Sequence, residues 1–378
     1  MTISLLNRSD QANCDRFPIE KPSSCVRIIS ANVAGLDHQG LDLEKWKASF
    51  TKTAGIFKRY KPDVLALQEV NTFYLTSLQQ KVDISYAICG SLCYIDKNRN
   101  LIYSREYNDH IKEKKNLTNT PFDSSDYTPI LYNADAMTCR DSGFYPLETT
   151  PTAPTPISTS LPSNCEVRTV TWVILQHKDT NKLWLIQNAH FDSNKQSAFS
   201  QCVETVTRET TRLVERVSSE DRKILTVVFT GDLNLFPAFK GKQNRGDVVY
   251  NQLIESFTDV RDLADHHFGP DGTFVGKSTP KYRFTGNPYT PSRSPKNLIE
   301  RLDHMFVQTT GVKVVNEAVI ADNPCLDKLD ENPFPLHRPP NTGNANTDSP
   351  SDHYFIAVDF APKEDLLPEE IASLDINQ

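Results

Sequence analysis

Polar side chains that can bind a metal or move a proton follow one apolar segment after another in this chain. The clearest case is TVVFTGDLNLFP (226–237), where a β-branched run stops at Gly231 and is followed by Asp232 and Asn234. The other positions of this kind are Asn32, Glu69, His190, Asp303, Asp352 and His353. Carboxylates, carboxamides and imidazoles of this kind suit Mg²⁺ or Mn²⁺ better than zinc. Together they supply what water needs to attack phosphorus: a metal, a base and donors that stabilise charge.

Each of these residues alone has an ordinary explanation, because Asn and Asp at a strand end are usually turn formers or helix caps. Polar residues that follow many apolar segments in succession, however, favour a shared site over separate turns and caps. Strands of one sheet that end on the same side deliver their terminal residues to one cleft. The elements must therefore bring these side chains to one place.

Apolar periodicity predicts more strands than helices. The sequence DTN between 167–178 and 182–193 also indicates a hairpin. Strands are expected over 26–35, 62–70, 85–95, 128–135, 167–178, 182–193, 226–237, 302–308 and 351–360, and helices over 43–60, 196–217 and 248–264. Loops are expected over 1–24, 104–128, 145–165, 268–299 and 320–350. This order predicts an α/β arrangement of two layers with mixed or antiparallel sheets.

No composition shift divides the 378 residues sharply. We therefore expect an irregular N-terminal segment (1–25), a single catalytic domain (26–361) and an acidic C-terminal tail (362–378). A hydrophobic content of 38% is sufficient for a sizeable core.

The formal net charge of −7 argues against tight, non-specific binding to DNA. No stretch approaches the ~20 apolar residues that span a bilayer. No signal peptide is recognised at the N-terminus, so the default expectation is a cytoplasmic monomer. The eight cysteines lack zinc-ligand spacing and are expected to be mostly reduced.

Six segments in order resemble the signatures of the endonuclease/exonuclease/phosphatase superfamily, which has the deoxyribonuclease I-like fold. They are SANVAGLD, PDVLALQEV, NAHFDS, FTGDLNLFP, RLDHMFV and SDHYFIAV, and they cover about residues 26–361. Further stretches, among them TPILYN, DSGFYPLETTP, RTVTW and GTFVG, resemble a subgroup of small metal-dependent hydrolases. The resemblance implies a two-layer β-sandwich of mixed sheets flanked by helices.

The resemblance also implies roles for the polar residues. Glu69 is the main metal ligand, with Asn32 beside it and Asp352 at the same or a second metal. Asp232 orients or deprotonates the attacking water, while Asn234, two residues on and on the same side of an extended chain, reaches the phosphate or the metal.

Histidines complete the implied site. His353 contacts the phosphoryl group, with Asp303 holding its other ring nitrogen. His190 donates to a non-bridging oxygen or to the leaving group. Tyr132 and Arg168 are further candidates for binding the substrate.

Three further histidines are expected to lie outside the site. His304 should point to the opposite face of the sheet from Asp303. The pair His266–His267 is expected to be solvated.

The activity expected is divalent-metal-dependent hydrolysis of a phosphoester by in-line attack of water, on a nucleotide, lipid or small metabolite. A nuclease acting on DNA or RNA is one alternative. A sphingomyelinase-like phosphodiesterase is another, with FYPL (144–147) as its candidate apolar loop. A catalytically inactive binding module on the same fold is the third.

Overall fold

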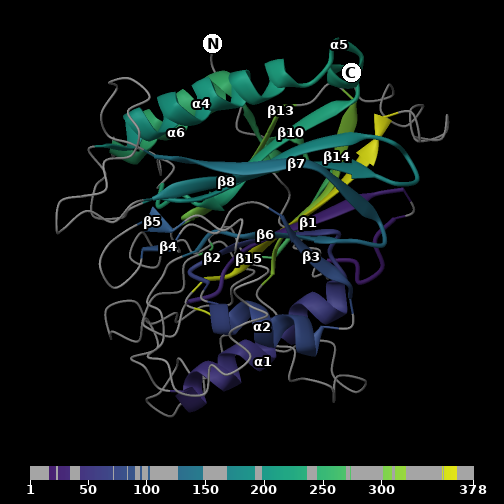
Figure 1. Cartoon of the computed structure of the whole chain (residues 1–378), viewed down its shortest axis with the longest axis vertical. Coiled ribbons are helices and arrows are strands. Elements are labelled where there is room, and N and C mark those ends of the chain that lie inside the picture. Colours follow the sequence, from purple (N-terminus) through teal and green to yellow (C-terminus); the bar gives the residue numbers. More distant parts are fainter. Residues whose placement is uncertain are drawn as a thin grey trace, which may run out of the picture.

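Two β-sheets packed face to face and covered on both outer sides by helices form the centre of the structure, which is a computed structural model (Figure 1). It describes residues 17–22, 24–34, 43–70, 72–82, 84–89, 94–95, 101–102, 127–147, 168–191, 198–235, 245–269, 273, 301–308, 311–320, 351 and 353–363.

The first sheet has seven strands and mixes parallel with antiparallel pairs. Its strands, in spatial order, are β12 (His266–Phe268), β14 (Val312–Ile320), β15 (Phe355–Pro362), β1 (Val26–Asn32), β2 (Val64–Gln68), β6 (Ile130–Asn133) and β3 (Tyr86–Cys89). Helices α1 (Leu43–Tyr60) and α2 (Thr72–Lys81) cover its outer face.

The second sheet has six strands and is also mixed. In order these are β11 (Thr258–Asp259), β13 (Asp303–Gln308), β10 (Leu225–Asp232), β9 (Leu183–His190), β8 (Thr169–His177) and β7 (Met137–Pro146). Helices α4 (Phe199–Arg216) and α6 (Arg245–Ser256) pack on its outer face. The remaining elements are α5 (Ser219–Arg222), α7 (Val260–Leu263) and a small pair, β4 (Tyr94–Ile95) and β5 (Leu101–Ile102).

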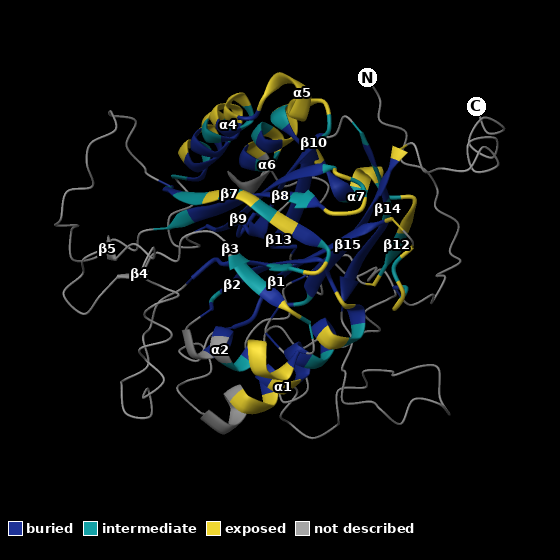
Figure 2. Ribbon diagram, turned by 45° about the vertical axis from the view of Figure 1, so that its right-hand side comes forward, coloured by how far each residue is buried: buried dark blue, intermediate teal, exposed yellow. Residues whose placement is uncertain are grey.

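Strand alternation explains how three apolar layers arise from these elements. On β1, Ile29 packs towards α1, whereas Ile28 faces the second sheet. On β10, Phe229 packs towards α4 and Val228 faces the first sheet. The central strands are therefore buried on both faces, which is why they read as continuous apolar runs (Figure 2). The predicted two-layer sandwich with flanking helices is confirmed.

The predicted single domain and its boundaries stay a prediction. Packing does begin before residue 26, because Phe17 is buried in the layer beneath α1, and its ring lies 4.5 Å from the Arg27 guanidinium. No helix among the described residues is long and apolar enough to cross a membrane.

The cysteines are only partly as expected. Cys25 and Cys202 are free, buried thiols. Burial and the nearby charge of Asp359 raise the pKa of Cys25 to about 12, so this thiol is unreactive at neutral pH. Cys139, in contrast, is disulfide-bonded. Cys139 is thus an exception to the expectation that the cysteines are mostly reduced.

A buried ion pair joins β1 to β15 at the end of the first sheet where β1 begins. Arg27 and Asp359 are both fully buried, and Arg27 Nε and Nη2 donate to the two carboxylate oxygens at 2.7 and 2.9 Å. Arg27 Nη1 also donates to the carbonyl oxygens of Ile19 and Tyr60, at 2.7 and 3.0 Å. One guanidinium therefore ties the N-terminal segment, α1 and two strands together.

Replacing Arg27 by methionine should lower the free energy of unfolding by about 3–5 kcal/mol, because Asp359 would remain buried and uncompensated. Urea unfolding followed by circular dichroism measures this loss. The double variant Arg27→Met/Asp359→Leu should recover most of it. Lys223→Met, which breaks an exposed pair with Glu220, should cost no more than about 1 kcal/mol. A loss below 1 kcal/mol for Arg27→Met would contradict the structural role of the pair.

Candidate active site

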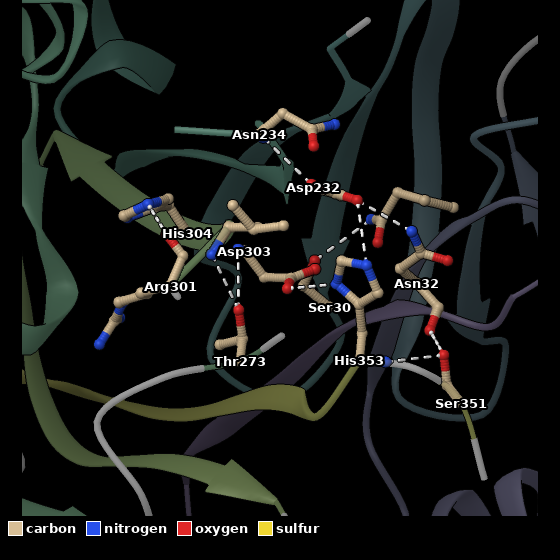
Figure 3. Close-up of polar contacts among 12 residues, drawn as sticks. Ser30, Asn32, Asp232, Asn234, Thr273, Arg301, Asp303, His304, Ser351 and His353 are labelled. Atoms are coloured by element: carbon tan, nitrogen blue, oxygen red, sulfur yellow. Dashed lines mark hydrogen bonds and ion pairs between the residues drawn. The ribbon is translucent and has the colours of Figure 1, made fainter. Parts of the chain in front are cut away.

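Three neighbouring strands of the six-stranded sheet end in register with a polar side chain each. Asp232 at the end of β10 pairs with His190 at the end of β9 on one side and with Asp303 at the start of β13 on the other. All three side chains are at least nine-tenths buried. The recurrence of polar residues at strand ends thus reflects a row of side chains across one sheet. Figure 3 shows two members of this row, Asp232 and Asp303.

The seven-stranded sheet contributes Asn32 and Glu69 from the ends of β1 and β2. Asn32 Nδ2 donates to Glu69 Oε1 at 3.1 Å and to Asp232 Oδ2 at 2.9 Å. A single carboxamide therefore bridges two carboxylates that come from different sheets. The two halves of the predicted site meet at Asn32.

Backbone strain after β2 turns the Glu69 side chain towards the cluster. Gln68 faces the interior of the sandwich, so ordinary alternation would point Glu69 away from it. Glu69 instead adopts a left-handed φ of 57°, and Ala34 and Asn234 show similar values of 48° and 49°. Non-glycine residues in this region cost roughly 1–3 kcal/mol each and concentrate at functional sites.

Gly231 permits a close approach of strands rather than a turn. It lies within β10 with φ 146°, and a Cβ there would come within 1.8 Å of the carbonyl oxygen of Ala189 on β9. Any larger residue would push β10 away from β9 immediately before Asp232. Gly231 is therefore part of the strand and does not end it.

His353 lies between the two aspartates. Its Nδ1 is 2.8 Å from Asp303 Oδ2, and its Nε2 is 3.6 Å from Asp232 Oδ2. Ser351 Oγ accepts from the His353 backbone N–H at 3.1 Å and donates to the Asn32 carbonyl at 2.8 Å. The imidazole is thus held in place through both its ring and its backbone.

His190 approaches Asp232 from the other side. Its Nε2 is 3.5 Å from Asp232 Oδ2, and its Nδ1 is 2.9 Å from Arg168 Nη1. Because a guanidinium can only donate, Nδ1 of His190 must be the acceptor, and the ring proton lies on Nε2, facing Asp232. Arg168, predicted as a substrate-binding residue, therefore adjoins the cluster through His190.

The two aspartates have opposite pKa shifts. Burial alone would raise the pKa of Asp232, but His353, His190 and hydrogen bonds from Asn32 and Asn234 lower it below the usual value. Burial, together with the charge of Asp232, raises the pKa of Asp303 despite its contact with His353. Asp232 is therefore the carboxylate that remains an anion most readily.

Two further predicted site residues are Asn234 and Asp352. Asn234 donates from its backbone to Asp232 Oδ1 at 3.1 Å, but its side chain donates to the Phe191 carbonyl at 2.8 Å. The argument that placed Asn234 by extended-chain alternation is wrong, because its left-handed backbone ends the strand pattern. Asp352 lies outside the described residues.

The structure does not bring Tyr132 to the cluster. Tyr132 on β6 pairs with Val64, at the opposite end of β2 from Glu69, and it packs against the apolar layer between the sheets. Burial raises the pKa of its phenol, which contacts the backbone of Cys139. The substrate-binding role predicted for Tyr132 is therefore corrected.

Sequence reasoning missed two hydroxyl side chains that hold the site. Ser351 is one, and Thr273 is the other, whose Oγ1 accepts from the backbone N–H groups of Leu302 and Asp303 at 3.0 Å each. The signal for Thr273 was present in the motif GTFVG, which carries no charge and so attracted no assignment.

The donor set suits a hard divalent cation. Asp232, Asp303 and His353 each offer a ligand atom within 4.8 Å of the others, and Glu69 adds a third carboxylate next to them. Asp303 Oδ1 is buried and accepts no hydrogen bond from any described residue. Asp303 Oδ2 is already occupied by His353 Nδ1. The carboxylate of Glu69, with Asn32 beside it, offers a further place for a cation.

A second buried charge network lies behind Asp303. Arg301 Nη2 is 3.3 Å from Glu317 Oε1 and 3.8 Å from Asp259 Oδ1. His304 points away from the cluster, as predicted, with Nδ1 3.7 Å from Asp259 Oδ2. His267, expected to be solvated, is instead half-buried and 3.1 Å from Glu317 Oε2. This network fixes the start of β13 from its reverse face.

The network should contribute to acid sensitivity. Burial alone would raise the pKa of Asp259 and of Glu317, but Arg301 and the neighbouring histidines outweigh burial and lower both values. Carboxylates with lowered pKa stabilise the folded state fully above their unfolded pKa of about 4, and this stability is lost as the pH falls from there through the lower pKa of the folded state. The free energy of unfolding should therefore fall below about pH 5.

Urea unfolding at a series of pH values tests this expectation. In Asp259→Asn the decline on acidification should be shallower than in the parent. The control is Asp262→Asn, because burial and the charge of Asp259 raise the pKa of Asp262, which gives the opposite sign. A slope unchanged by Asp259→Asn would show that the network does not titrate in this range.

Comparison with known proteins establishes the family. The profile of the Endonuclease/Exonuclease/phosphatase family matches residues 29–353. The chain therefore belongs to this family, whose members are generally hydrolases of phosphoester bonds. No curated protein sequence matches the chain.

Solved structures with the same fold are distant in sequence. An endonuclease/exonuclease/phosphatase from Bacteroides vulgatus is 20% identical, with TM-score 0.60, covering 90% of this chain and 99% of its own. A mannosyl-6-phosphatase from Bacteroides thetaiotaomicron is 18% identical, with TM-score 0.59, covering 89% and 99%. The human Nocturnin catalytic domain, with a bound sulfate anion, is 12% identical, with TM-score 0.52, covering 90% and 94%. These likenesses confirm the deoxyribonuclease I-like fold.

Proposed function

We propose that this protein hydrolyses phosphoester bonds with the help of Mg²⁺ or Mn²⁺, by in-line attack of water on phosphorus. The observation that carries the proposal is the Asn32 bridge between Glu69 and Asp232, with His353 and His190 on either side of Asp232. A divalent cation at Glu69 would supply the positive charge that a phosphoryl group needs.

The residues of the chain then have separate tasks. Asp232, an anion of lowered pKa, orients the attacking water by accepting a hydrogen bond from it. His353 and His190 carry their Nε2 atoms towards the same region and donate to phosphoryl oxygens. Asp303 holds the ring of His353 through Nδ1.

The two histidines have different neighbours, which suit them to different tasks: His353 contacts two carboxylates, and His190 contacts the Arg168 guanidinium. His353, in contact with two carboxylates, is stabilised as the charged imidazolium and neutralises charge on the phosphoryl group. At His190, the Arg168 guanidinium donates to Nδ1, so the ring proton on Nε2 is the one available to a phosphoryl oxygen. Arg168 holds that tautomer and adds positive charge at the edge of the cluster.

The lipid alternative loses its supporting observation. Phe144–Pro146 belong to β7 rather than to a loop, and Tyr145 and Leu147 are buried. The acidic net charge likewise gives no support for a nuclease. A phosphorylated small metabolite is therefore the substrate class we would test first.

Turnover of two chromogenic substrates tests the proposal. The purified protein should hydrolyse p-nitrophenyl phosphate or bis-p-nitrophenyl phosphate with added Mg²⁺ or Mn²⁺ and lose this activity in EDTA. Preference between them separates a phosphomonoesterase from a phosphodiesterase. A panel of sugar phosphates, oligonucleotides and phospholipids then identifies the natural class. Absence of metal-dependent turnover on every substrate would favour the inactive binding module instead.

A further inference from the structure

The side chains between the two sheets become more polar towards the site, from apolar through uncharged polar to charged. On β9, Trp184 and Ile186 face the other sheet in the apolar layer, and Asn188 and His190 follow on the same face. On β1, Ile28 is followed in the same way by Ser30 and Asn32. A layer of uncharged polar side chains therefore separates the apolar core from the charged site.

Two buried carboxamides connect the sheets in this middle layer. Gln68 Nε2 donates to Asn188 Oδ1 at 2.7 Å and to Ser30 Oγ at 3.2 Å. Asn188 Nδ2 donates back to the carbonyl oxygens of Leu67 at 2.8 Å and Pro129 at 3.0 Å. Gln68, Asn188 and Ser30 are all fully buried.

Gln68 and Asn188 each lie one or two residues before a site residue in the sequence. Gln68 precedes Glu69, and Asn188 lies two residues before His190 on the same face of β9. Gln68 belongs to the seven-stranded sheet and Asn188 to the six-stranded sheet. The hydrogen bonds that Asn188 makes with Gln68 and Leu67 cross from one sheet to the other. They do so next to Glu69 on one sheet and next to His190 on the other.

Resting on the proposed function, we propose that Gln68 and Asn188 form an amide clamp, a pair of positioning residues that sets the spacing of the two sheets and thereby of Glu69 and His190. The site is split between the sheets, so its geometry depends on their separation. Apolar side chains in this layer would stabilise the sandwich comparably but would not fix one separation. Catalysis is sensitive to such spacing, because a displacement of 1 Å can cost about 10²-fold in rate.

The same strand offers a matched control. Gln187, next to Asn188, is also fully buried, but it faces the helix side of the sheet. Its Oε1 accepts from Tyr145 Oη at 2.8 Å and its Nε2 donates to Thr210 Oγ1 at 2.8 Å. Gln187→Leu therefore removes a hydrogen-bonded buried carboxamide of similar burial without touching the contact between the sheets.

The experiment compares Gln68→Met, Asn188→Leu, their double variant and Gln187→Leu with the parent. Each clamp variant should lower kcat about 10²-fold, with KM and Mn²⁺ affinity changed less than threefold, because Glu69 and Asn32, which would hold the cation, both belong to the seven-stranded sheet. Gln187→Leu should lower the melting temperature comparably but change kcat less than threefold. The double variant should lose little more kcat than either single variant, since both remove the same contact.

A readout without turnover measures the spacing itself. Site-specific spin labels at the exposed Lys47 on α1 and Glu204 on α4 report the distance between the helices that cover the two sheets. The distance distribution should broaden or shift in the clamp variants and not in Gln187→Leu. If a clamp variant does not fold, Ser30→Ala, which removes one contact to Gln68, should broaden the distribution to a smaller degree.

The outcomes separate the two proposals. If the parent hydrolyses phosphoesters but the clamp variants lose no more kcat than Gln187→Leu, or their distance distributions match that of the parent, the clamp is wrong and the proposed function stands. If the parent lacks metal-dependent turnover, the proposed function fails, and the spin-label distances alone still decide whether the clamp sets the separation of the sheets.

Discussion

Replacing Asp232 by asparagine is expected to lower kcat roughly 10³-fold, within the 10²–10⁴ range typical of a positioned proton-handling group. Asp232 is the residue on which both halves of the site converge. Its Oδ2 accepts from Asn32 at 2.9 Å and faces the Nε2 atoms of His190 and His353 at 3.5 and 3.6 Å. A neutral carboxamide would remove the anion that orients water and favours the imidazolium of His353.

The expected loss is in kcat rather than in folding. Asparagine has nearly the same shape as aspartate, and the backbone N–H of Asn234 can still donate to its side-chain oxygen. The assay is the metal-dependent hydrolysis described above, with the melting temperature as the check on folding. Asp262→Asn, on α7 and outside the cluster, is the control and should retain full activity. If Asp232→Asn kept more than a tenth of the parent kcat, our assignment of this residue would be wrong.

Replacing Glu69 by glutamine is expected to abolish most binding of the cation. A divalent cation supplies several kcal/mol of stabilisation to charge at a phosphoryl group, which corresponds to roughly 10³-fold in kcat. Glu69 is held for this purpose by a left-handed backbone and by the Asn32 side chain at 3.1 Å. Glutamine preserves this shape but removes the charge that a hard cation requires.

Calorimetric titration with Mn²⁺ and the kcat assay measure the two parts of this expectation. In Glu69→Gln the Mn²⁺ affinity should fall at least about 10²-fold, together with the loss of kcat. Glu317→Gln is the matched control, because Glu317 is a buried glutamate whose partners are Arg301 and His267. Its Mn²⁺ affinity should equal that of the parent. Unchanged affinity in Glu69→Gln would place the cation elsewhere.

The sequence predicts best the elements that are buried on both faces. The strands that became β1, β2, β9 and β10 are mostly apolar, and the polar residues at their ends stood out against the apolar residues that precede them. Helix α4 was equally clear, since Phe199, Cys202, Val206 and Leu213 form one buried stripe. Amphipathic periodicity is strongest in such elements.

Edge and interrupted strands were missed for identifiable reasons. β7 is an edge strand that alternates between the core and solvent, and it contains Gly143 and ends at Pro146. β14 carries the buried polar residues Asn316 and Glu317 and an irregular register between Val314 and Asn316, so its apolar pattern is broken. Tertiary partners, not local preference, stabilise both strands.

The predicted helix over 248–264 was also interrupted by tertiary contacts. α6 ends at Ser256, and β11 follows because Thr258 and Asp259 pair with β13. The Asp259 side chain accepts from Tyr250 Oη at 2.9 Å and from the Arg261 backbone N–H at 3.0 Å, where it caps α7. The pairing of β11 with β13 involves residues distant in the chain and could not be predicted from periodicity.

The site was predicted by residue type, but its geometry depends on features that the sequence does not show directly. Nothing in the pattern indicated that Glu69 and Asn234 adopt left-handed backbones, or that Gly231 serves a close approach of strands. The contact of Arg168 with His190 likewise arises from neighbouring strands of one sheet. Sequence reasoning therefore names the residues of such a site more reliably than it assigns their contacts.

Crystals grown with Mn²⁺ and inorganic phosphate test the central claim most directly, through the anomalous scattering of manganese. Our account predicts a manganese peak bonded to the Glu69 carboxylate, with a phosphate next to it that accepts hydrogen bonds from Nε2 of His353 and Nε2 of His190. A manganese ion bound away from Glu69, or a phosphate bound outside the space between the two histidines, would contradict it.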